Sequence, residues 1–232
     1  MPLSKLVDKL YAVEIDSDLS CLLKEKLQSC QNVTLINTDI LKIDLKKLLS
    51  LGARGERESN KIKVIGNIPY YISTPIIEYL ILYRQHISKA YLTVQKEFAR
   101  RIIATPGTRD YGSLSCFVQY YTLPKVIFDI KNGSFLPSPK VDSSFISLSI
   151  RQRLPLSASQ EKLFFGILRG AFGKRRKTLR NSLQGIIPQS ILSSFLERNN
   201  LPQDIRPERL ALADFLNLAK FLKKTQKKVD KT

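Results

Sequence analysis

Apolar and polar residues alternate along the first 150 residues in a way that predicts strands and helices in turn. The apolar stretch at residues 10–16 predicts a short buried strand that ends in acidic residues, and residues 17–27 carry apolar side chains at helical spacing. Residues 33–39 and 64–66 predict two further strands. This alternation indicates an α/β fold built around a mostly parallel, Rossmann-like sheet.

Two later segments, 118–130 and 144–150, predict an antiparallel pair at the edge of that sheet. The pattern changes after residue 152, where every predicted element is helical. These helices are expected at residues 159–172, 177–183, 188–198 and 207–222. Pro207 suits the first turn of the last of them. We therefore expect two domains, an α/β domain over residues 1–152 and a small all-helical domain over residues 153–232.

The formal net charge is +18, and the positive charge is concentrated in the predicted helical domain. Residues 151–232 hold 18 Lys and Arg against 6 Asp and Glu, whereas residues 1–150 hold 20 against 14. A basic surface of this kind is typical of an RNA partner. The candidate phosphate contacts lie where a helix is expected to begin, at Lys174, Arg175, Arg176, Lys177 and Arg180. A solvated helix face is the alternative, and it is preferred for the Lys-rich tail after residue 222.

Two acidic residues stand where predicted strands end, Glu14 after the first and Asp39 after the second. Ligands of open α/β sheets bind at the carboxyl ends of the strands, where an acid can accept hydrogen bonds from ribose hydroxyls. Glu14 suits that role, and Asp39 suits an acceptor for an adenine amino group. Taken singly, either acid is more often a helix cap or a solvated residue at a strand end than a ligand contact.

The tetrapeptide Asn67-Ile68-Pro69-Tyr70 follows the third predicted strand and suits a purine amine. The Asn67 side-chain oxygen and the Pro69 carbonyl can each accept one N–H of that amine, while the Tyr70 ring stacks on the base. Holding the amine in this way favours the tetrahedral geometry that alkylation requires. A plain strand end followed by a turn is the alternative interpretation, and the tetrapeptide alone does not decide between them.

The cysteine content and the hydropathy limit which cellular compartments are expected for this protein. Cys21, Cys30 and Cys116 are odd in number and lack metal-ligand spacing, which predicts reduced, buried thiols in a cytoplasmic or organelle-matrix protein and no metal site. His86 is the only histidine, which disfavours catalytic triads. No stretch is long and apolar enough to predict a membrane span.

Further along the chain, five segments and the tetrapeptide together resemble the ribosomal RNA adenine N6-dimethyltransferases. The family modifies two adjacent adenines near the 3′ end of small-subunit rRNA. The segments occur in the family's order and cover nearly the whole chain. They are residues 95–101 (QKEFARR), 110–115 (DYGSLS), 135–143 (FLPSPKVDS), 171–183 (AFGKRRKTLRNSL) and 206–210 (RPERL).

The resemblance implies the cofactor S-adenosylmethionine (SAM) and a set of site residues. Glu14 would contact the ribose of SAM, Asp39 its adenine, and Asn67 the region near the transferable methyl. Asn67, the Pro69 carbonyl and the Tyr70 ring would hold the target adenine, and Phe135 would stack on its other face. A core residue beside a proline turn is the alternative for Phe135. The implied partner is small-subunit rRNA in a precursor particle, bound by a monomeric enzyme.

One departure from the family pattern lies at the N-terminus. The family begins with a short arm and a first strand that runs into a Gly-rich loop beside SAM, and neither motif occurs in this sequence. Residues 1–6 align best with the helix after that loop. The missing strand is central in the family's sheet, so two ladders are expected to lack a partner and SAM is expected to bind weakly.

Two alternatives to this function stay open. Large-subunit rRNA adenine methyltransferases that confer macrolide resistance also contain Asn-Ile-Pro-Tyr, although residues 175–180 and 206–208 resemble the small-subunit group more closely. A non-catalytic RNA-binding assembly factor, or a decayed fragment of the family, is favoured by the absent Gly-rich loop. The intact set of Glu14, Asp39 and residues 67–70 favours an enzyme.

Overall fold

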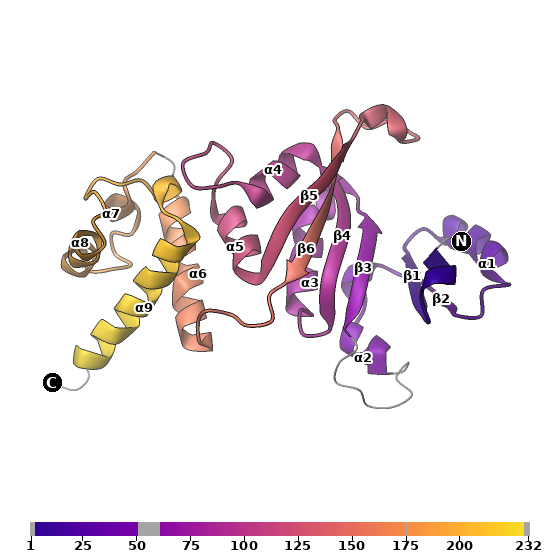
Figure 1. Ribbon diagram of the computed structural model, residues 1–232, viewed down its shortest axis with the longest axis horizontal. Helices are drawn as coiled ribbons and strands as arrows, with labels where there is room; N and C mark the ends of the chain where they lie inside the picture. The colour runs from indigo at the N-terminus through magenta and orange to yellow at the C-terminus, as the bar shows by residue number, and fades with distance from the viewer. Residues whose placement is uncertain (1–2, 51–60, 175, 230–232) are drawn as a thin grey trace. The chain divides into compact units, whose positions relative to one another are not determined.

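The computed structural model describes residues 3–50, 61–174 and 176–229 (Figure 1). Contacts divide the chain into two units, Met1–Lys61 with Thr74–His86, and Ile62–Ser73 with Ile87–Thr232. Each unit contains its own sheet, and no ladder joins the two sheets within the described ranges.

The first unit contains a two-stranded parallel sheet and short helices. β1 pairs with β2 from Leu10 opposite Val33 to Glu14 opposite Asn37. The Tyr79 hydroxyl donates a hydrogen bond to the Ile43 carbonyl oxygen at 3.0 Å and so joins the last helix of the unit to the segment after β2. The elements are η1 (Leu3–Leu6), β1 (Leu10–Glu14), α1 (Ser17–Leu27), β2 (Val33–Asn37), η2 (Ile40–Lys42), α2 (Leu45–Ser50) and all but the first residue of α3 (Ser73–Leu82).

Asp16 caps α1, and replacing it tests the local stability of this unit. Its carboxylate accepts hydrogen bonds from the backbone N–H groups of Asp18 at 2.9 Å and Leu19 at 3.0 Å. Asp16→Ala is expected to destabilise the unit by about 1 kcal/mol, because two N–H groups of the first turn lose their acceptor. Urea unfolding followed by circular dichroism at the helix band measures this. The control is Asp8→Ala, outside any helix, and equal midpoints for the two variants would contradict the cap.

The second unit contains a mixed four-stranded sheet in the order β3-β4-β6-β5 (Figure 1). β3 and β4 are parallel, while β6 is antiparallel to both β4 and β5. Apolar residues at alternate positions of β4 and β6 form one fully buried face, with Ala90, Leu92, Val94, Ile146 and Leu148 at most 1% exposed. The strands are β3 (Ile62–Asn67), β4 (Ile87–Gln95), β5 (Thr122–Ile130) and β6 (Ser143–Ile150).

The predicted antiparallel edge pair is confirmed, but the prediction that its first strand begins at residue 118 is wrong. α4 (Lys96–Ile103) and α5 (Ser113–Tyr121) follow β4, and residues 118–121 form the last turn of α5. The aromatic and β-branched residues there resemble a strand locally. In the fold, the Tyr120 ring packs on Phe164 of the next helix with ring centroids 5.0 Å apart. The Thr122 hydroxyl donates to the Val118 carbonyl oxygen and ends the helix.

The segment after residue 152 is helical, as the sequence predicts, and lies in the same unit as the four-stranded sheet. α6 and α9 pack against each other, and the Phe172 and Phe215 rings meet between them with centroids 5.7 Å apart. The separate folding of residues 1–152 and 153–232 stays a prediction. The helical elements are α6 (Ala158–Phe172), α7 (Leu179–Ser182), α8 (Gln189–Arg198), η5 (Pro207–Arg209) and α9 (Leu212–Val229).

Two helix boundaries differ from the prediction. The helix expected at residues 177–183 is limited to α7, which Thr178 caps by accepting a hydrogen bond from the backbone N–H of Asn181. The helix expected at residues 207–222 is divided: Pro207 begins the short η5, and α9 starts only at Leu212. The Asp214 carboxylate accepts the Ala211 N–H at 2.8 Å and so places the start of α9 after η5.

The three cysteines form no disulfide, and the prediction that all of them are buried is wrong, because Cys21 is exposed and Cys30 is half-buried. Cys116 is fully buried, and burial raises the pKa of its thiol to about 11. Its sulfur lies 3.1 Å from the Tyr111 hydroxyl oxygen. A thiol with so high a pKa stays protonated at neutral pH and is a poor nucleophile. The described helices include none with the length and apolar character needed to cross a membrane.

Candidate active site

β3 ends at Asn67, and the chain passes through Pro69 into η3 (Tyr70–Ile72). Asn67 lies opposite Thr93 of β4, and its side chain is exposed with no hydrogen bond to the described part of the chain. The Pro69 carbonyl oxygen accepts the Ile72 N–H at 3.1 Å. Because a carbonyl oxygen has two lone pairs, this one can still accept a second hydrogen bond. The end of β3 therefore offers two hydrogen-bond acceptors, one amide oxygen and one backbone oxygen.

The Tyr70 side chain is anchored at its far end. Its hydroxyl lies 2.7 Å from the hydroxyl of Ser143, which is fully buried at the start of β6. Its backbone carbonyl oxygen accepts the Ser73 hydroxyl at 3.0 Å. With the hydroxyl bonded to one strand and the backbone to the next helix, the direction of the Tyr70 ring is restricted. By contrast, the neighbouring Tyr71 is 86% exposed.

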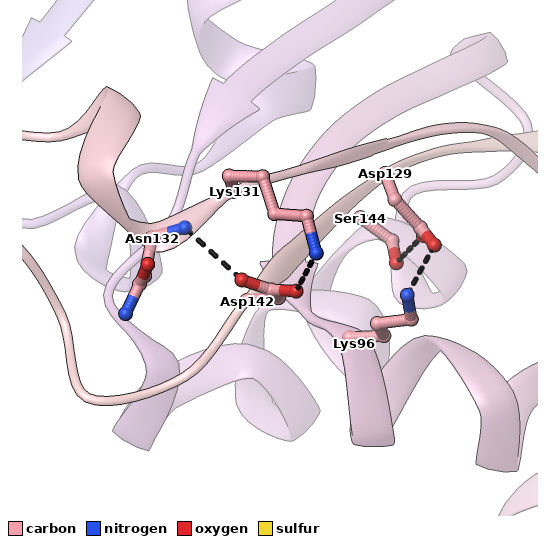
Figure 2. A network of polar contacts seen from close by, with 6 residues as sticks. All are labelled: Lys96, Asp129, Lys131, Asn132, Asp142 and Ser144. Atoms are coloured by element: carbon pink, nitrogen blue, oxygen red, sulfur yellow. Dashed lines mark hydrogen bonds and ion pairs between the residues drawn. The ribbon is translucent and has the colours of Figure 1, made fainter.

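Asp142 closes the loop that carries Phe135, as Figure 2 shows. One carboxylate oxygen accepts the backbone N–H of Asn132, and the other binds the Lys131 ammonium, both at 3.1 Å. The Asp142 carbonyl oxygen in turn accepts the Lys96 N–H at 3.0 Å at the start of α4. The two ends of loop 131–142 are thereby joined to each other and to α4. Phe135 is half-buried within this loop.

A second ion pair lies beside this loop (Figure 2). The Lys96 ammonium binds the Asp129 carboxylate, which also accepts the Ser144 hydroxyl at 2.7 Å. These contacts lower the pKa of Asp129, with the Lys96 bond the largest cause. The pKa of Asp142 is lowered as well, first by the Asn132 N–H and then by Lys131. Both carboxylates therefore stay ionised at neutral pH and keep their partners.

Glu14 and Asp39 lie in the first unit, at the carboxyl ends of adjacent parallel strands. One Glu14 carboxylate oxygen accepts the Asp16 N–H at 2.9 Å. Asp39 follows β2 by two residues and caps η2 by accepting the Leu41 N–H at 2.9 Å. Each carboxylate thus has a local structural role, as the capping alternative anticipates, and each has a second oxygen without a partner among the described residues. That second oxygen is available to a ligand.

The structure brings together some of the predicted site residues of the second unit, but not all of them. Tyr70 bonds to Ser143, and the adjacent Asp142 closes the loop that carries Phe135. Asn67, Pro69 and Tyr70 are consecutive at the end of β3. No direct contact joins Phe135 to Tyr70 within the described ranges. Glu14 and Asp39 belong to the other unit, and the two groups are described separately.

Comparison with known proteins decides the family. The model of the family described as "Ribosomal RNA adenine dimethylase" matches residues 1–224. The chain is 40% identical to "Ribosomal RNA small subunit methyltransferase A" of Alkaliphilus oremlandii, across 96% of this chain and 77% of that protein. The chain belongs to the ribosomal RNA adenine dimethylase family. A protein of the same name from Caldanaerobacter subterraneus is 38% identical, across 95% of this chain and 81% of its own length.

Two solved structures share the fold of this dimethylase. A dimethyladenosine transferase from Plasmodium falciparum superposes with a TM-score of 0.76 at 25% identity, covering 96% of this chain and 86% of that one. The 23S rRNA methyltransferase ErmE superposes with a TM-score of 0.72 at 22% identity, covering 95% and 84%, and shows likeness of fold alone. The predicted methyltransferase fold with a helical C-terminal part is confirmed.

Family membership establishes the class of reaction, which is methylation of adenine in ribosomal RNA with SAM as the general methyl donor of such enzymes. Within residues 3–50, 61–174 and 176–229, no group of three or more His, Cys, Asp and Glu is arranged to hold a metal ion. The acceptors at the end of β3 suit an amine.

The basic segment of the dimethylase precedes a helix instead of starting one. Lys174, Arg176 and Lys177 are exposed and lie before α7, so the prediction that they begin a helix is wrong. Arg176 has a φ of 64°, which a regular helix does not allow. Arg180 alone lies in α7, half-buried, and Arg175 lies outside the described residues. Three cations are thus free to meet a phosphate backbone.

Reversing two of these charges tests the RNA contact. Arg176→Glu with Lys177→Glu is expected to weaken binding of an RNA duplex and to make it less dependent on salt. Each lost phosphate contact removes roughly 0.9 from the slope of log affinity against log salt. Fluorescence anisotropy from about 50 to 300 mM salt measures the slope. Lys162→Glu with Lys220→Glu serves as the control for net charge, and a slope unchanged from the wild type would place Arg176 and Lys177 in solvent.

The residues that fix the site geometry were missed as functional candidates. Lys96, Asp142 and Ser143 occur in the motifs that carry the family resemblance, but no local pattern assigns them a role. Asp129 lies outside those motifs. Their partners are far apart in sequence, as in the Lys96–Asp129 pair. A signal was present for Asp142 alone, which lies just before the strand predicted at residues 144–150, because Asp side chains in loops commonly accept nearby backbone N–H groups.

Proposed function

We propose that this dimethylase transfers two methyl groups from SAM to the N6 atom of each of two adjacent adenosines near the 3′ end of small-subunit rRNA. The modification would accompany maturation of the small ribosomal subunit. The observation that carries the proposal is the pair of free acceptors at Asn67 and Pro69 beside the anchored Tyr70. The relatives named as small-subunit enzymes, among them that of Alkaliphilus oremlandii, support the choice of RNA.

The target base is held by residues of the second unit. The Asn67 amide oxygen and the Pro69 carbonyl oxygen each accept one N–H of the adenine amine, which draws its lone pair out of conjugation with the ring. The Tyr70 ring stacks on one face of the base and Phe135 on the other. The Asp142 clasp, defined as the bonds from Asp142 to Lys131 and Asn132, keeps the Phe135 loop in place for this contact.

SAM would supply the methyl group when bound. The free carboxylate oxygen of Glu14 would accept ribose hydroxyls, and that of Asp39 would accept the adenine amine of the cofactor. Asn67 would contact the region near the transferable methyl. The protein orients the adenine amine and the methyl donor and excludes water from between them. This raises the fraction of time that the two groups spend in the in-line geometry needed for transfer. No general base is required, because the methylated amine loses its proton to solvent late in the reaction.

We further propose that the enzyme acts as a monomer on a precursor of the small subunit, in the cytoplasm or an organelle matrix. The three free thiols support a reducing compartment. The positive charge of the helical segment supports an RNA-rich partner.

Mapping the modified nucleotide tests the choice of substrate. Undermethylated small-subunit and large-subunit RNAs, each in its ribosomal particle, are incubated with the protein and SAM. Primer extension then stops at dimethylated adenines. Two adjacent stops near the 3′ end of the small-subunit RNA are expected. Stops in the large-subunit RNA would favour the alternative enzyme class, and binding without any stop would favour the non-catalytic assembly factor.

A further inference from the structure

A polar cleft of about 410 Å³ opens in the helical segment between α7, the start of α8 and residues 203–204. Every residue that lines it is polar: one arginine, one aspartate, one threonine and four side-chain amides. The cleft contains none of the residues proposed above to hold SAM or the target adenine. Its volume falls in the range of pockets that bind small molecules, while its lining is more polar than is usual for them.

Arg180 lies in this cleft as a fixed and uncompensated cation. Its Nε donates to the Gln189 side-chain oxygen at 3.3 Å, and its Nη1 donates to the Gln203 side-chain oxygen at 3.4 Å. Both glutamines are held in turn, Gln189 by the Arg180 carbonyl oxygen and Gln203 by that of Ser193. Arg180 forms no ion pair with the described carboxylates. The neutral amides thus orient the guanidinium without neutralising it, and they leave some of its five N–H groups unused.

The other lining residues include groups that are free to bind. Asn181, Gln184 and Asp204 line the cleft and are exposed, and their side chains make no hydrogen bond to the described part of the chain. The cleft therefore combines a cation, a carboxylate and two free amides. A simple inorganic anion suits it poorly because Asp204 repels it. An apolar molecule suits it poorly because it would leave these groups without partners.

The edge of a nucleobase has the complementary chemistry, since it displays donors and acceptors side by side. Asn and Gln side chains bind adenine edges through two bonds, Arg binds guanine, and Asp accepts from the amino group of cytosine. Such edges are accessible only where the base is unpaired, which is how proteins usually read RNA sequence. The cleft thus suits a single unpaired nucleotide better than a base-paired duplex.

Cations flank the cleft on two sides, where the backbone of the same RNA strand would pass. Lys174, Arg176 and Lys177 are exposed and directly precede the residues of the cleft. A neighbouring hollow of about 430 Å³ shares Asp204 with the cleft and is lined in part by Arg206 and Arg209. These cations can contact phosphates without regard to sequence, while the amides and Asp204 contact the base.

We propose that this cleft binds one unpaired nucleotide of the RNA substrate and discriminates between bases at that position. The proposal rests on the proposed function in one respect, namely that the partner is RNA. The role of Arg180 then differs from the phosphate contact that the sequence suggests. Together with Gln189 and Gln203, it forms the fixed part of a base-reading site. The exposed cations supply the general affinity for phosphates.

Removing the two free amides tests the proposal. The variant Asn181→Ala with Gln184→Ala is compared with Asn217→Ala, an exposed amide on α9 away from the cleft. Anisotropy is measured with 12-nucleotide single strands of A, C or U, and with a blunt RNA duplex. The wild type and Asn217→Ala are expected to prefer one strand by roughly fivefold or more, the lower end of the discrimination given by one good base contact. The double variant is expected to lose that preference and to keep its duplex affinity and salt slope.

Two outcomes would overturn the proposal: a wild type that binds the three strands equally, or a double variant that keeps the wild-type preference. Titration of the isotope-labelled wild type with nucleoside 5′-monophosphates gives a readout that needs no substitution. The side-chain amide resonances of Asn181 and Gln184 should move with a nucleotide and not with inorganic phosphate, and equal movement with phosphate would also contradict base reading. If the protein preferred one of the three single strands but transferred no methyl group, the cleft would still be assigned as a base-reading site. Only the proposed function would then be overturned.

Discussion

Replacing Asn67 with Ala is expected to reduce methyl transfer by roughly a hundred- to a thousandfold, the usual cost of losing one oriented hydrogen-bond partner of the reacting group. The Asn67 side chain is exposed at the end of β3 and bonds to nothing else that the structure describes. Its removal therefore leaves the fold intact but removes one of the two acceptors that hold the amine. The rate of methyl incorporation from labelled SAM at saturating RNA measures the effect.

Two comparisons make the Asn67 result specific. Asn67→Asp keeps an acceptor at the same position and is expected to retain more activity than Asn67→Ala. RNA affinity should be nearly the same for all three proteins, because the basic segment at residues 174–177 is unchanged. An alanine variant with wild-type turnover would remove Asn67 from the site. Loss of RNA affinity in proportion to the loss of rate would show that Asn67 acts in binding only.

Replacing Asp142 with Ala is expected to lower turnover by roughly 10- to 100-fold, because a displaced contact far from the reacting atoms can cost that much. The Asp142 clasp joins Lys131 and Asn132 at one end of the loop to the start of β6 at the other (Figure 2). Without it, Phe135 loses its fixed position opposite Tyr70 in the proposed site. Turnover and the Michaelis constant for RNA are measured together, and the effect should appear mainly in turnover.

Partial removal of the clasp separates its two bonds. Asp142→Asn keeps an acceptor for the Asn132 N–H but loses the ion pair, and Lys131→Ala removes the exposed partner. Both variants are expected to lose less turnover than Asp142→Ala, because exposed ion pairs contribute little to stability. If the alanine variant matched the wild type in turnover, loop 131–142 would have no part in catalysis.

The expected pH dependence of turnover follows from the direction in which the pKa of Asp142 is shifted. Its pKa is lowered, first by the Asn132 N–H and then by Lys131, so the clasp is complete above the ordinary carboxylate pKa and is lost only as pH falls through the lowered value. Turnover of the wild type should therefore show no titration from this group between about pH 5 and 8. A titration in that window that disappears in Asp142→Asn would contradict this account of the clasp.

Much of the fold follows from short-range patterns. The helix Ser17–Leu27 has the bounds predicted for it, because an acidic cap and apolar spacing are both local signals. The strands predicted at residues 10–16 and 64–66 form as β1 and β3, although their bounds are Leu10–Glu14 and Ile62–Asn67. The family resemblance then adds the cofactor and the base, neither of which composition could name.

The structure differs from the sequence prediction where contacts between residues far apart in sequence decide the local conformation. Residues 118–121 have strand-like side chains but form a helix because Tyr120 packs on Phe164 of α6. Arg180 belongs to a basic run in sequence, yet it is held by Gln189 and Gln203. Lys96 and Asp129 meet from separate elements. No local pattern contains these pairings, because each depends on how the helices and strands pack.

The central claim is that this chain dimethylates two adenosines, and the most direct measurement is the yield of N6,N6-dimethyladenosine in nucleosides from a reaction taken to completion. The substrate is an undermethylated small-subunit particle, and mass spectrometry counts the product. The account predicts about two dimethyladenosines per RNA, since the proposed site methylates each amine twice at both adjacent adenines. RNA that is bound by the protein but contains no dimethyladenosine would contradict the account and identify the chain as a non-catalytic binder.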